Sequence, residues 1–240
     1  MSEAIKLEVF DTAESAAQRA ANIIAEEARK AASARGRFDF AVSGGHTPWM
    51  MLRALADTDV PWPAVHIVQV DERMAPAGHP DRNLTHLRES LLDRAPLTAG
   101  QIHAMPVESA DLDRAAAQYA ATLRQIAGSP PVLDLVHLGL GPDGHTASLV
   151  PGDPVLNVND ADVAMTGIYQ GRRRMTLTYP MINRSRRILW VVTGGEKIQM
   201  LNRLLDGDES IPAGRIRREQ ALLLADKAAA GPSAKNTKGA

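Results

Sequence analysis

A carboxylate and an imidazole two residues apart, Asp143 and His145, are the clearest candidates for chemistry in this sequence. They follow a run rich in valine and leucine, 132–138, that is short enough to form a buried parallel strand. Three glycines within 139–144 loosen the backbone around them. Ligands of open α/β sheets bind beyond the carboxyl ends of the strands, so the pair is placed for proton transfer with a bound molecule.

The same glycines match the G-x-G-x-x-G pattern of a dinucleotide-binding turn. A full-length helix should follow such a turn, but Pro151 and Gly152 leave only 146–150 for it. This argues against a nicotinamide site. The interpretation of Asp143 and His145 as ordinary turn residues stays open on their spacing alone.

The segment SGGHTP places a second glycine loop between a predicted strand at 38–42 and a predicted helix at 49–55. Two glycines before a helix, with a proline near its first turn, let backbone N–H groups converge on an anion at the helix N-terminus. The loop lacks the lysine of a Walker motif, so a plain strand-to-helix turn remains the alternative. The candidate phosphate ligands of this loop are Ser43, Gly44, Gly45 and Thr47.

Two further predicted strands end in charged residues. The strand at 66–70 is followed by DER, which contributes Asp71 and Arg73. A loop of about twelve residues comes next, a length typical of functional loops. The strand at 187–193 is followed by GGEK, which ends at Lys197. A lysine in the first turn of a helix opposes the helix dipole, which indicates an anion bound beside it.

A basic cluster, Arg172 to Arg174, precedes a predicted strand at 175–178. Basic clusters are usually solvated, and the sequence leaves open which of these arginines faces a ligand. The candidates for the anion site are Arg73 and Lys197, together with Arg172 or Arg174 from this cluster. Each charge-assisted hydrogen bond to an anion contributes about 1.5–3 kcal/mol.

Helices alternate with strands along the chain, which predicts a largely parallel sheet. The predicted helices cover 12–34, 49–55, 83–92, 111–126 and 197–205. The predicted strands cover 5–10, 38–42, 66–70, 102–105, 132–138, 163–168, 175–178, 187–193 and 221–225. Because parallel strands share one carboxyl edge, the four motifs should converge on a single cleft.

Composition excludes several classes of protein. The chain has 240 residues, 45% of them hydrophobic and 23% charged, which suits an α/β protein with an ample core. Its formal net charge of −1 predicts binding to neither nucleic acid nor an anionic membrane. The absence of cysteine excludes disulfides, thiol catalysis and thiolate metal sites. No cluster of histidine and aspartate has the spacing of a catalytic metal site.

We expect a single domain over residues 1–227 and a disordered tail over 228–240. No basic segment with an apolar core opens the chain, and no apolar run reaches about 18 residues. We therefore expect a soluble cytoplasmic protein. A monomer or weak homo-oligomer is the expected state.

The motifs SGGHTP, VDER, LGLGPDGHTASLVPG, RRRMTLTYPMIN and VTGGEK resemble, in this order, those of the 6-phosphogluconolactonases. That family belongs with the glucosamine-6-phosphate isomerase/deaminase group, and the resemblance spans residues 38–219. It implies a Rossmann-like, three-layer α/β/α fold. It also implies hydrolysis of a small phosphosugar lactone, 6-phospho-D-glucono-1,5-lactone, to 6-phosphogluconate in the oxidative pentose phosphate pathway, without metal or organic cofactor.

The resemblance also implies roles for individual residues. His145 is the expected general base toward water, with Asp143 and Asp71 as orienting or auxiliary acid/base groups. A neutral imidazole suits this task because its unperturbed pKa of about 6.5 lies near working pH. The expected phosphate ligands are Ser43, Gly44, Gly45, Thr47, Arg73, Lys197 and Arg174.

Three residues depart from the family pattern. His46 stands where the family usually has a small hydroxyl residue, and Arg82 stands where it usually has the serine of S-N-Y. Val150 stands where the related deaminases carry a glutamate for sugar ring opening, which favours a lactonase over an amino-sugar-phosphate deaminase or isomerase. A non-catalytic sugar-phosphate sensor is the remaining hypothesis, although the effector module that a sensor normally carries is not visible.

Overall fold

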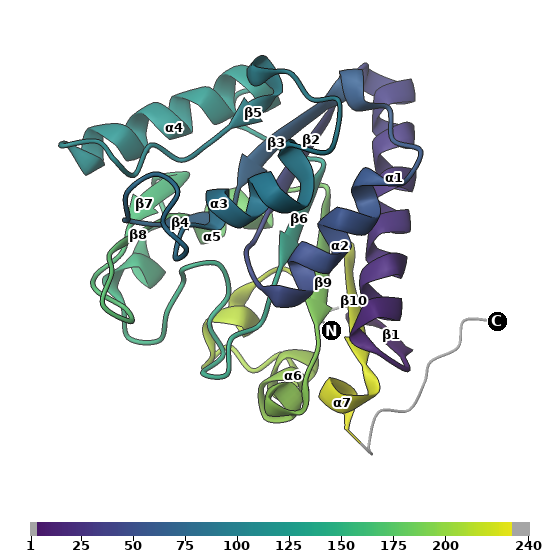
Figure 1. Cartoon of the computed structure of the whole chain (residues 1–240). Coiled ribbons are helices and arrows are strands. Elements are labelled where there is room, and N and C mark those ends of the chain that lie inside the picture. The colour runs from purple at the N-terminus through teal and green to yellow at the C-terminus, as the bar shows by residue number, and fades with distance from the viewer. Residues whose placement is uncertain (1–3, 232–240) are drawn as a thin grey trace.

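Short apolar runs form a central sheet of seven parallel strands in the order β1-β10-β9-β6-β2-β3-β5 (Figure 1). The computed structural model describes residues 4–231. The strands are β1 (Lys6–Phe10), β2 (Phe38–Val42), β3 (Val65–Gln69), β5 (Ile102–His103), β6 (Leu135–Leu138), β9 (Arg187–Val192) and β10 (Ala221–Asp226). The prediction of a largely parallel sheet is confirmed, since the central strands are buried and pair in parallel.

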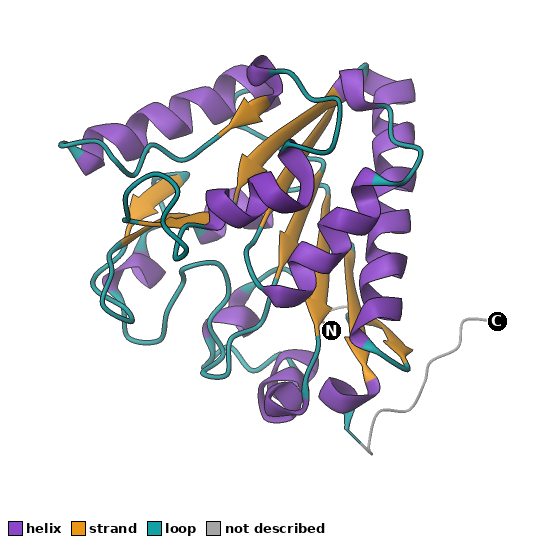
Figure 2. Ribbon diagram, viewed as in Figure 1, coloured by secondary structure: helices purple, strands orange, loops and turns teal. Residues whose placement is uncertain are grey.

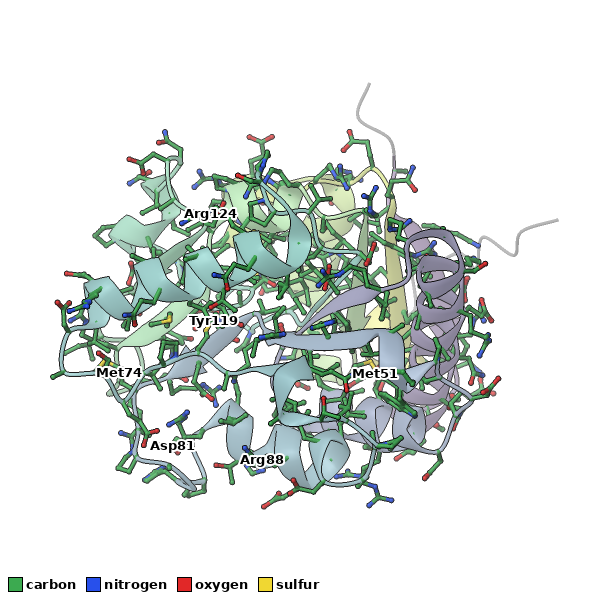
Figure 3. All side chains as sticks on the ribbon, turned by 90° about the horizontal axis from the view of Figure 1, so that it is seen from above. Met51, Met74, Asp81, Arg88, Tyr119 and Arg124 are labelled. Atoms are coloured by element: carbon green, nitrogen blue, oxygen red, sulfur yellow. The ribbon has the colours of Figure 1, made fainter. Side chains whose placement is uncertain are left out.

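Helices cover both faces of this sheet, which gives three layers (Figure 2). One face packs against α1 (Ala13–Arg35), α2 (His46–Ala56), α3 (Asn83–Leu87) and the π-helical turn Arg88–Leu92. The other packs against α4 (Leu112–Ala127), α5 (Tyr179–Asn183), α6 (Ile198–Asp206) and α7 (Lys227–Ala230). Figure 3, seen from above, places Met51 of α2 and Tyr119 of α4 on opposite sides of the sheet.

The longest helix, α1, has defined ends and a small-residue face. Its N-cap Thr12 accepts a hydrogen bond from the Ser15 N–H at 3.2 Å, and the Ser15 hydroxyl accepts one from the Thr12 N–H at 3.2 Å. Gly36 ends the helix with a φ of 73°. Buried alanines along one side of the helix let it approach the sheet closely.

A second, antiparallel sheet of three strands lies beside the parallel one. It consists of β4 (Asp71–Arg73), β8 (Arg174–Leu177) and β7 (Val163–Met165) in that order. Arg73 is paired with Arg174 in this sheet. The pairing therefore brings the VDER motif and the basic cluster to the same place.

The remaining regular segments are short 3₁₀ helices. They are Trp62–Ala64, Ala99–Gln101, Pro154–Asn157, Gly195–Lys197 and Pro212–Arg215. Of the expected tail, 228–230 belong to α7, and 232–240 lie outside the described residues. No helix within 4–231 combines the length and apolarity needed to cross a membrane.

Candidate active site

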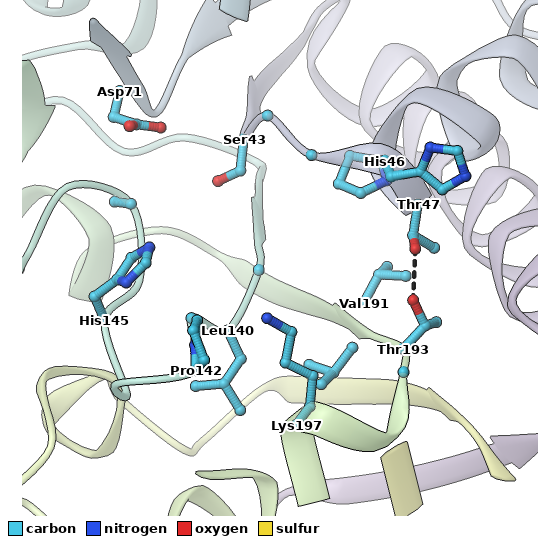
Figure 4. A pocket seen from close by; sticks show the side chains of 18 of the residues that line it. Ser43, His46, Thr47, Asp71, Leu140, Pro142, His145, Val191, Thr193 and Lys197 are labelled. Carbon is cyan, nitrogen blue, oxygen red and sulfur yellow. Dashed lines mark hydrogen bonds between the residues drawn. The ribbon is translucent and has the colours of Figure 1, made fainter. Parts of the chain in front are cut away.

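A cavity of about 480 Å³ opens at the carboxyl ends of β2, β6 and β9, next to β4 and β8 (Figure 4). All but one of the predicted site residues line it, namely Ser43, Gly44, Gly45, Thr47, Asp71, Arg73, His145, Arg174 and Lys197. The exception, Asp143, contacts His145 instead. In Figure 4, Asp71 and His145 lie on one side of the cavity and Thr47 and Thr193 on the other.

His145 and Asp143 form a hydrogen-bonded pair. Nδ1 of His145 lies 2.5 Å from Oδ1 of Asp143, and the His145 backbone N–H donates to the same oxygen at 3.2 Å. Burial raises the pKa of Asp143, but His145 and the Tyr169 hydroxyl together outweigh burial and lower it. An ionised Asp143 accepts the proton of Nδ1, which leaves a lone pair on Nε2. Nε2 has no hydrogen-bond partner within 4–231, and the imidazole points into the cavity.

Asp71 is the second carboxylate of the cavity and is only 4% exposed. Its Oδ2 accepts a 2.6 Å hydrogen bond from the Ser148 hydroxyl. The side-chain amide of Asn83 donates to Oδ1 of Asp71 at 3.3 Å and to its backbone oxygen at 3.0 Å. These contacts hold the carboxylate in one orientation at the cavity wall.

The loop after β2 offers backbone donors rather than a free hydroxyl. The N–H groups of Gly44 and Gly45 make no hydrogen bond to the described part of the chain. A Cβ at Gly44 would lie 2.1 Å from Oδ1 of Asn83, so only glycine fits there. The Ser43 hydroxyl donates to the His137 backbone oxygen at 2.9 Å. The loop therefore presents its amides to the cavity at the start of α2, where an anion is favoured.

Three cations line the same cavity, and two of them have unsatisfied donors. The Nε atoms of Arg73 and Arg174 are buried without a partner among residues 4–231. Arg174 is only 4% exposed, and burial together with the charge of Arg73 lowers its pKa. Lys197 lies 3.8 Å from the Glu196 carboxylate, a long and weak contact. The positive charges of the three side chains favour an anion in the cavity.

The structure separates the three arginines of the basic cluster. Arg172 donates to Oδ2 of Asp81 at 2.6 Å, and Arg173 is exposed and donates to the Thr166 backbone oxygen. Arg174, in contrast, lines the cavity. Nowhere in 4–231 do three histidine or acidic side chains gather in a way that could hold a metal ion.

Comparison with known proteins shows the family of this chain. Residues 11–224 match the family described as glucosamine-6-phosphate isomerases/6-phosphogluconolactonase. The chain belongs to this family. A 6-phosphogluconolactonase from Synechocystis is 39% identical to this chain over 191 residues, which cover 78% of this chain and 79% of the relative.

Solved structures agree with the fold of this family. The 6-phosphogluconolactonase of Trypanosoma brucei superposes with a TM-score of 0.85 at 26% identity, covering 96% of this chain and 99% of that one. A monomeric glucosamine-6-phosphate deaminase superposes with a TM-score of 0.82 at 19% identity, covering 94% and 99%. The second likeness concerns the fold alone. The expected family and the expected three-layer α/β fold are thus both confirmed.

The three departures from the family pattern have distinct positions. His46 is exposed and begins α2 at the cavity rim. Arg82 is buried and lies 3.2 Å from the Glu72 carboxylate. It therefore forms an internal ion pair and does not line the cavity. Val150 is buried and does not line the cavity. No carboxylate therefore stands at the position where the deaminases of this family group carry theirs.

Four residues of the site escape prediction from the sequence. Ser148 lies within the GPDGHTAS motif and Thr193 within VTGGEK, so both motifs contained a signal for these residues. The Oγ1 atoms of Thr193 and Thr47 are 2.5 Å apart. Asn83 begins α3 and stands at the asparagine of the S-N-Y segment, so this segment also contained a signal. Tyr169 lies in a polar loop, and nothing in its neighbours indicates that it reaches Asp143.

Proposed function

We propose that this chain hydrolyses 6-phospho-D-glucono-1,5-lactone to 6-phospho-D-gluconate, the lactonase step of the oxidative pentose phosphate pathway. The observation that carries the proposal is the Asp143–His145 pair, whose Nε2 has no hydrogen-bond partner among residues 4–231 and faces a cavity lined by Arg73, Arg174 and Lys197. One side of this cavity is suited to proton transfer and the other to a phosphate. A lactone that carries a phosphate needs both.

The phosphate end of the substrate binds among the amides of Gly44 and Gly45 and the cations Arg73, Lys197 and Arg174. Each charge-assisted bond contributes about 1.5–3 kcal/mol, which fixes the orientation of the lactone. Thr47, at the start of α2, and His145 lie on different sides of one cavity, so a phosphate bound at the start of α2 leaves the lactone carbonyl near His145.

Hydrolysis then proceeds through a tetrahedral intermediate. Nε2 of His145 takes a proton from water, and the water oxygen forms a bond to the lactone carbonyl carbon. Asp143 stabilises the resulting imidazolium through Nδ1. When the intermediate collapses, the bond from this carbon to the ring oxygen breaks, and the imidazolium returns its proton to that oxygen. Asp71 acts as the auxiliary carboxylate on the same side of the cavity.

The initial rate of lactone loss in wild type and His145→Ala tests the proposal, with a 6-phosphogluconate readout and correction for spontaneous hydrolysis. We expect a rate well above background that falls roughly 10²–10⁴-fold in the variant. His86→Ala, at a half-buried histidine of α3 that does not line the cavity, is the matched control and should retain the wild-type rate.

Two results would refute the proposal: no acceleration by folded wild type, or an undiminished rate in His145→Ala.

Ammonia release from glucosamine 6-phosphate is measured with the same preparation. With Val150 in place of the deaminase carboxylate, we expect none.

A further inference from the structure

The connection between β7 and β8, residues 166–173, is a tight hairpin that carries Tyr169 to the catalytic side of the cavity. Tyr169 and Arg172 pair through backbone hydrogen bonds of 2.9 and 3.2 Å. The two residues between them, Gln170 and Gly171, have φ values of 51° and 78°. Two positive φ angles define the type I′ turn, which matches the natural twist of two antiparallel strands. The hairpin is therefore built to hold its side chains in fixed positions.

Tyr169 contacts both members of the base pair. Its hydroxyl donates a 2.9 Å hydrogen bond to Oδ2 of Asp143, the carboxylate oxygen that does not face His145. Its ring lies edge-on against the imidazole of His145, with 5.4 Å between the ring centroids. On the other side of the ring, the guanidinium of Arg174 lies 4.8 Å from the centroid.

We propose that Tyr169 is a positioning residue of the base, whose hydroxyl holds the Asp143 carboxylate against His145 and shares its negative charge. The inference rests on the proposed function for its kinetic consequences, but not for the contact itself. Tyr169 does not line the cavity and therefore acts through Asp143 rather than on the substrate. Burial, and next the Asp143 carboxylate, raise the pKa of Tyr169, so the phenol keeps the proton that it donates to Asp143.

The electrostatic effect of the hydroxyl has a definite direction. Without this donor, Oδ2 of Asp143 carries more charge, and the neighbouring imidazolium becomes more stable. The base is then protonated at a higher pH than in wild type. The charged and titratable groups around His145 come from four segments: Asp143 on its own loop, Tyr169 and Arg174 on the hairpin and β8, Asp71 and Arg73 on β4, and Lys197 after β9. Of these, only the donor to Asp143 changes in Tyr169→Phe.

The test is the pH profile of kcat/KM for Tyr169→Phe, which removes the hydroxyl and keeps the ring. We expect the midpoint of the acidic limb of this profile, where kcat/KM decreases with falling pH, to shift to higher pH by about half a unit or more. At a fixed pH on that limb, kcat/KM should then fall roughly threefold. On the alkaline plateau the rate should stay within about twofold of wild type, with an unchanged KM. Ile168→Ala, on the same hairpin but 77% exposed, is the matched control and should leave the limb in place.

A hydroxyl that only stabilised the hairpin would lower the rate equally at every pH. That result, or a limb that stays in place or moves down, overturns the inference. An NMR titration of the His145 imidazole in the same three proteins checks the contact without substrate, and the midpoint should rise only in Tyr169→Phe. If wild type fails to accelerate lactone loss, the proposed function fails, and this titration still decides the role of Tyr169.

Discussion

The hydroxyl of Ser148 donates a 2.6 Å hydrogen bond to Oδ2 of Asp71, and it joins two motifs that are 77 residues apart in the chain. Ser148 follows the candidate base in the GPDGHTAS loop, and Asp71 begins β4 of the antiparallel sheet. Both side chains are buried, at 0% and 4% exposure. The loop that carries His145 is thus fastened to the sheet that carries Arg73 and Arg174.

Loss of this contact should affect both folding and activity. In Ser148→Ala, one donor to a buried carboxylate disappears, which should lower the free energy of unfolding by about 1–3 kcal/mol. The freed Asp71 side chain should also lower kcat/KM, by roughly tenfold. Denaturant unfolding and lactone hydrolysis measure the two effects. Ser109→Ala, on an exposed turn, serves as the control. A Ser148→Ala enzyme with unchanged activity would show that activity does not depend on the Ser148–Asp71 hydrogen bond.

Arg174 should be the arginine of the basic cluster that binds substrate, because it alone among Arg172, Arg173 and Arg174 lines the cavity. Arg174→Lys keeps the charge but removes the planar fork, so we expect kcat/KM to fall about tenfold or more. Arg173→Lys, on the exposed neighbour, should stay within about twofold. If Arg174→Lys retains as much activity as Arg173→Lys, Arg174 contributes only its positive charge and not its planar guanidinium group.

Much of the fold follows from local sequence patterns. Apolar runs between glycine, proline and polar segments mark each strand of the central sheet, and their alternation with helices makes the sheet parallel. The antiparallel sheet is harder to predict, because β4 and β7 have only three residues each and their pairing joins segments far apart in sequence. Strands this short show no periodicity of their own.

The candidate site shows the same division. The glycine loop, Asp71, His145 and Lys197 stand directly at strand ends, where the topology of a parallel sheet places ligands, so their convergence could be predicted. The direction in which Arg174 points could not, because neighbouring residues of a strand face opposite sides and the register is set by distant pairing. Tyr169 reaches the site through a hairpin whose geometry only the folded chain defines.

Lys197 should recognise the phosphate rather than the lactone. For Lys197→Gln we expect the KM of the phosphorylated lactone to rise roughly tenfold or more, because a charge-assisted hydrogen bond is lost. Hydrolysis of the unphosphorylated lactone should not change. Lys227→Gln is the control, since this exposed lysine pairs with Asp11 away from the cavity. A Lys197 variant that loses activity equally on both lactones would place the lysine at the reacting end.

The stability of the protein should depend on pH through Asp39, which lies at the end of the sheet opposite the cavity. Asp39, at the start of β2, is 3% exposed, with Arg37 at 2.7 Å. Its backbone N–H donates to the carboxylate of Asp134. Burial, which outweighs the favourable Arg37 contact, together with the charge of Asp134 raises the pKa of Asp39 from 3.8 to about 6. Between these two values the native state holds a proton that the unfolded state has lost, so stability falls as pH rises from about 4 to 6.

This contribution amounts to about 3 kcal/mol at most, since one pKa unit corresponds to 1.36 kcal/mol. Asp39→Asn keeps an acceptor for Arg37 and removes the charge, so its stability relative to wild type should grow over this pH range and then level off above pH 6. Denaturant unfolding of both proteins at several pH values measures the difference, which cancels the titration of groups remote from Asp39. Asp57→Asn, at an exposed aspartate that caps the C-terminus of α2, is the matched control for the substitution. A flat difference for Asp39→Asn would mean that Arg37 fully compensates the buried charge.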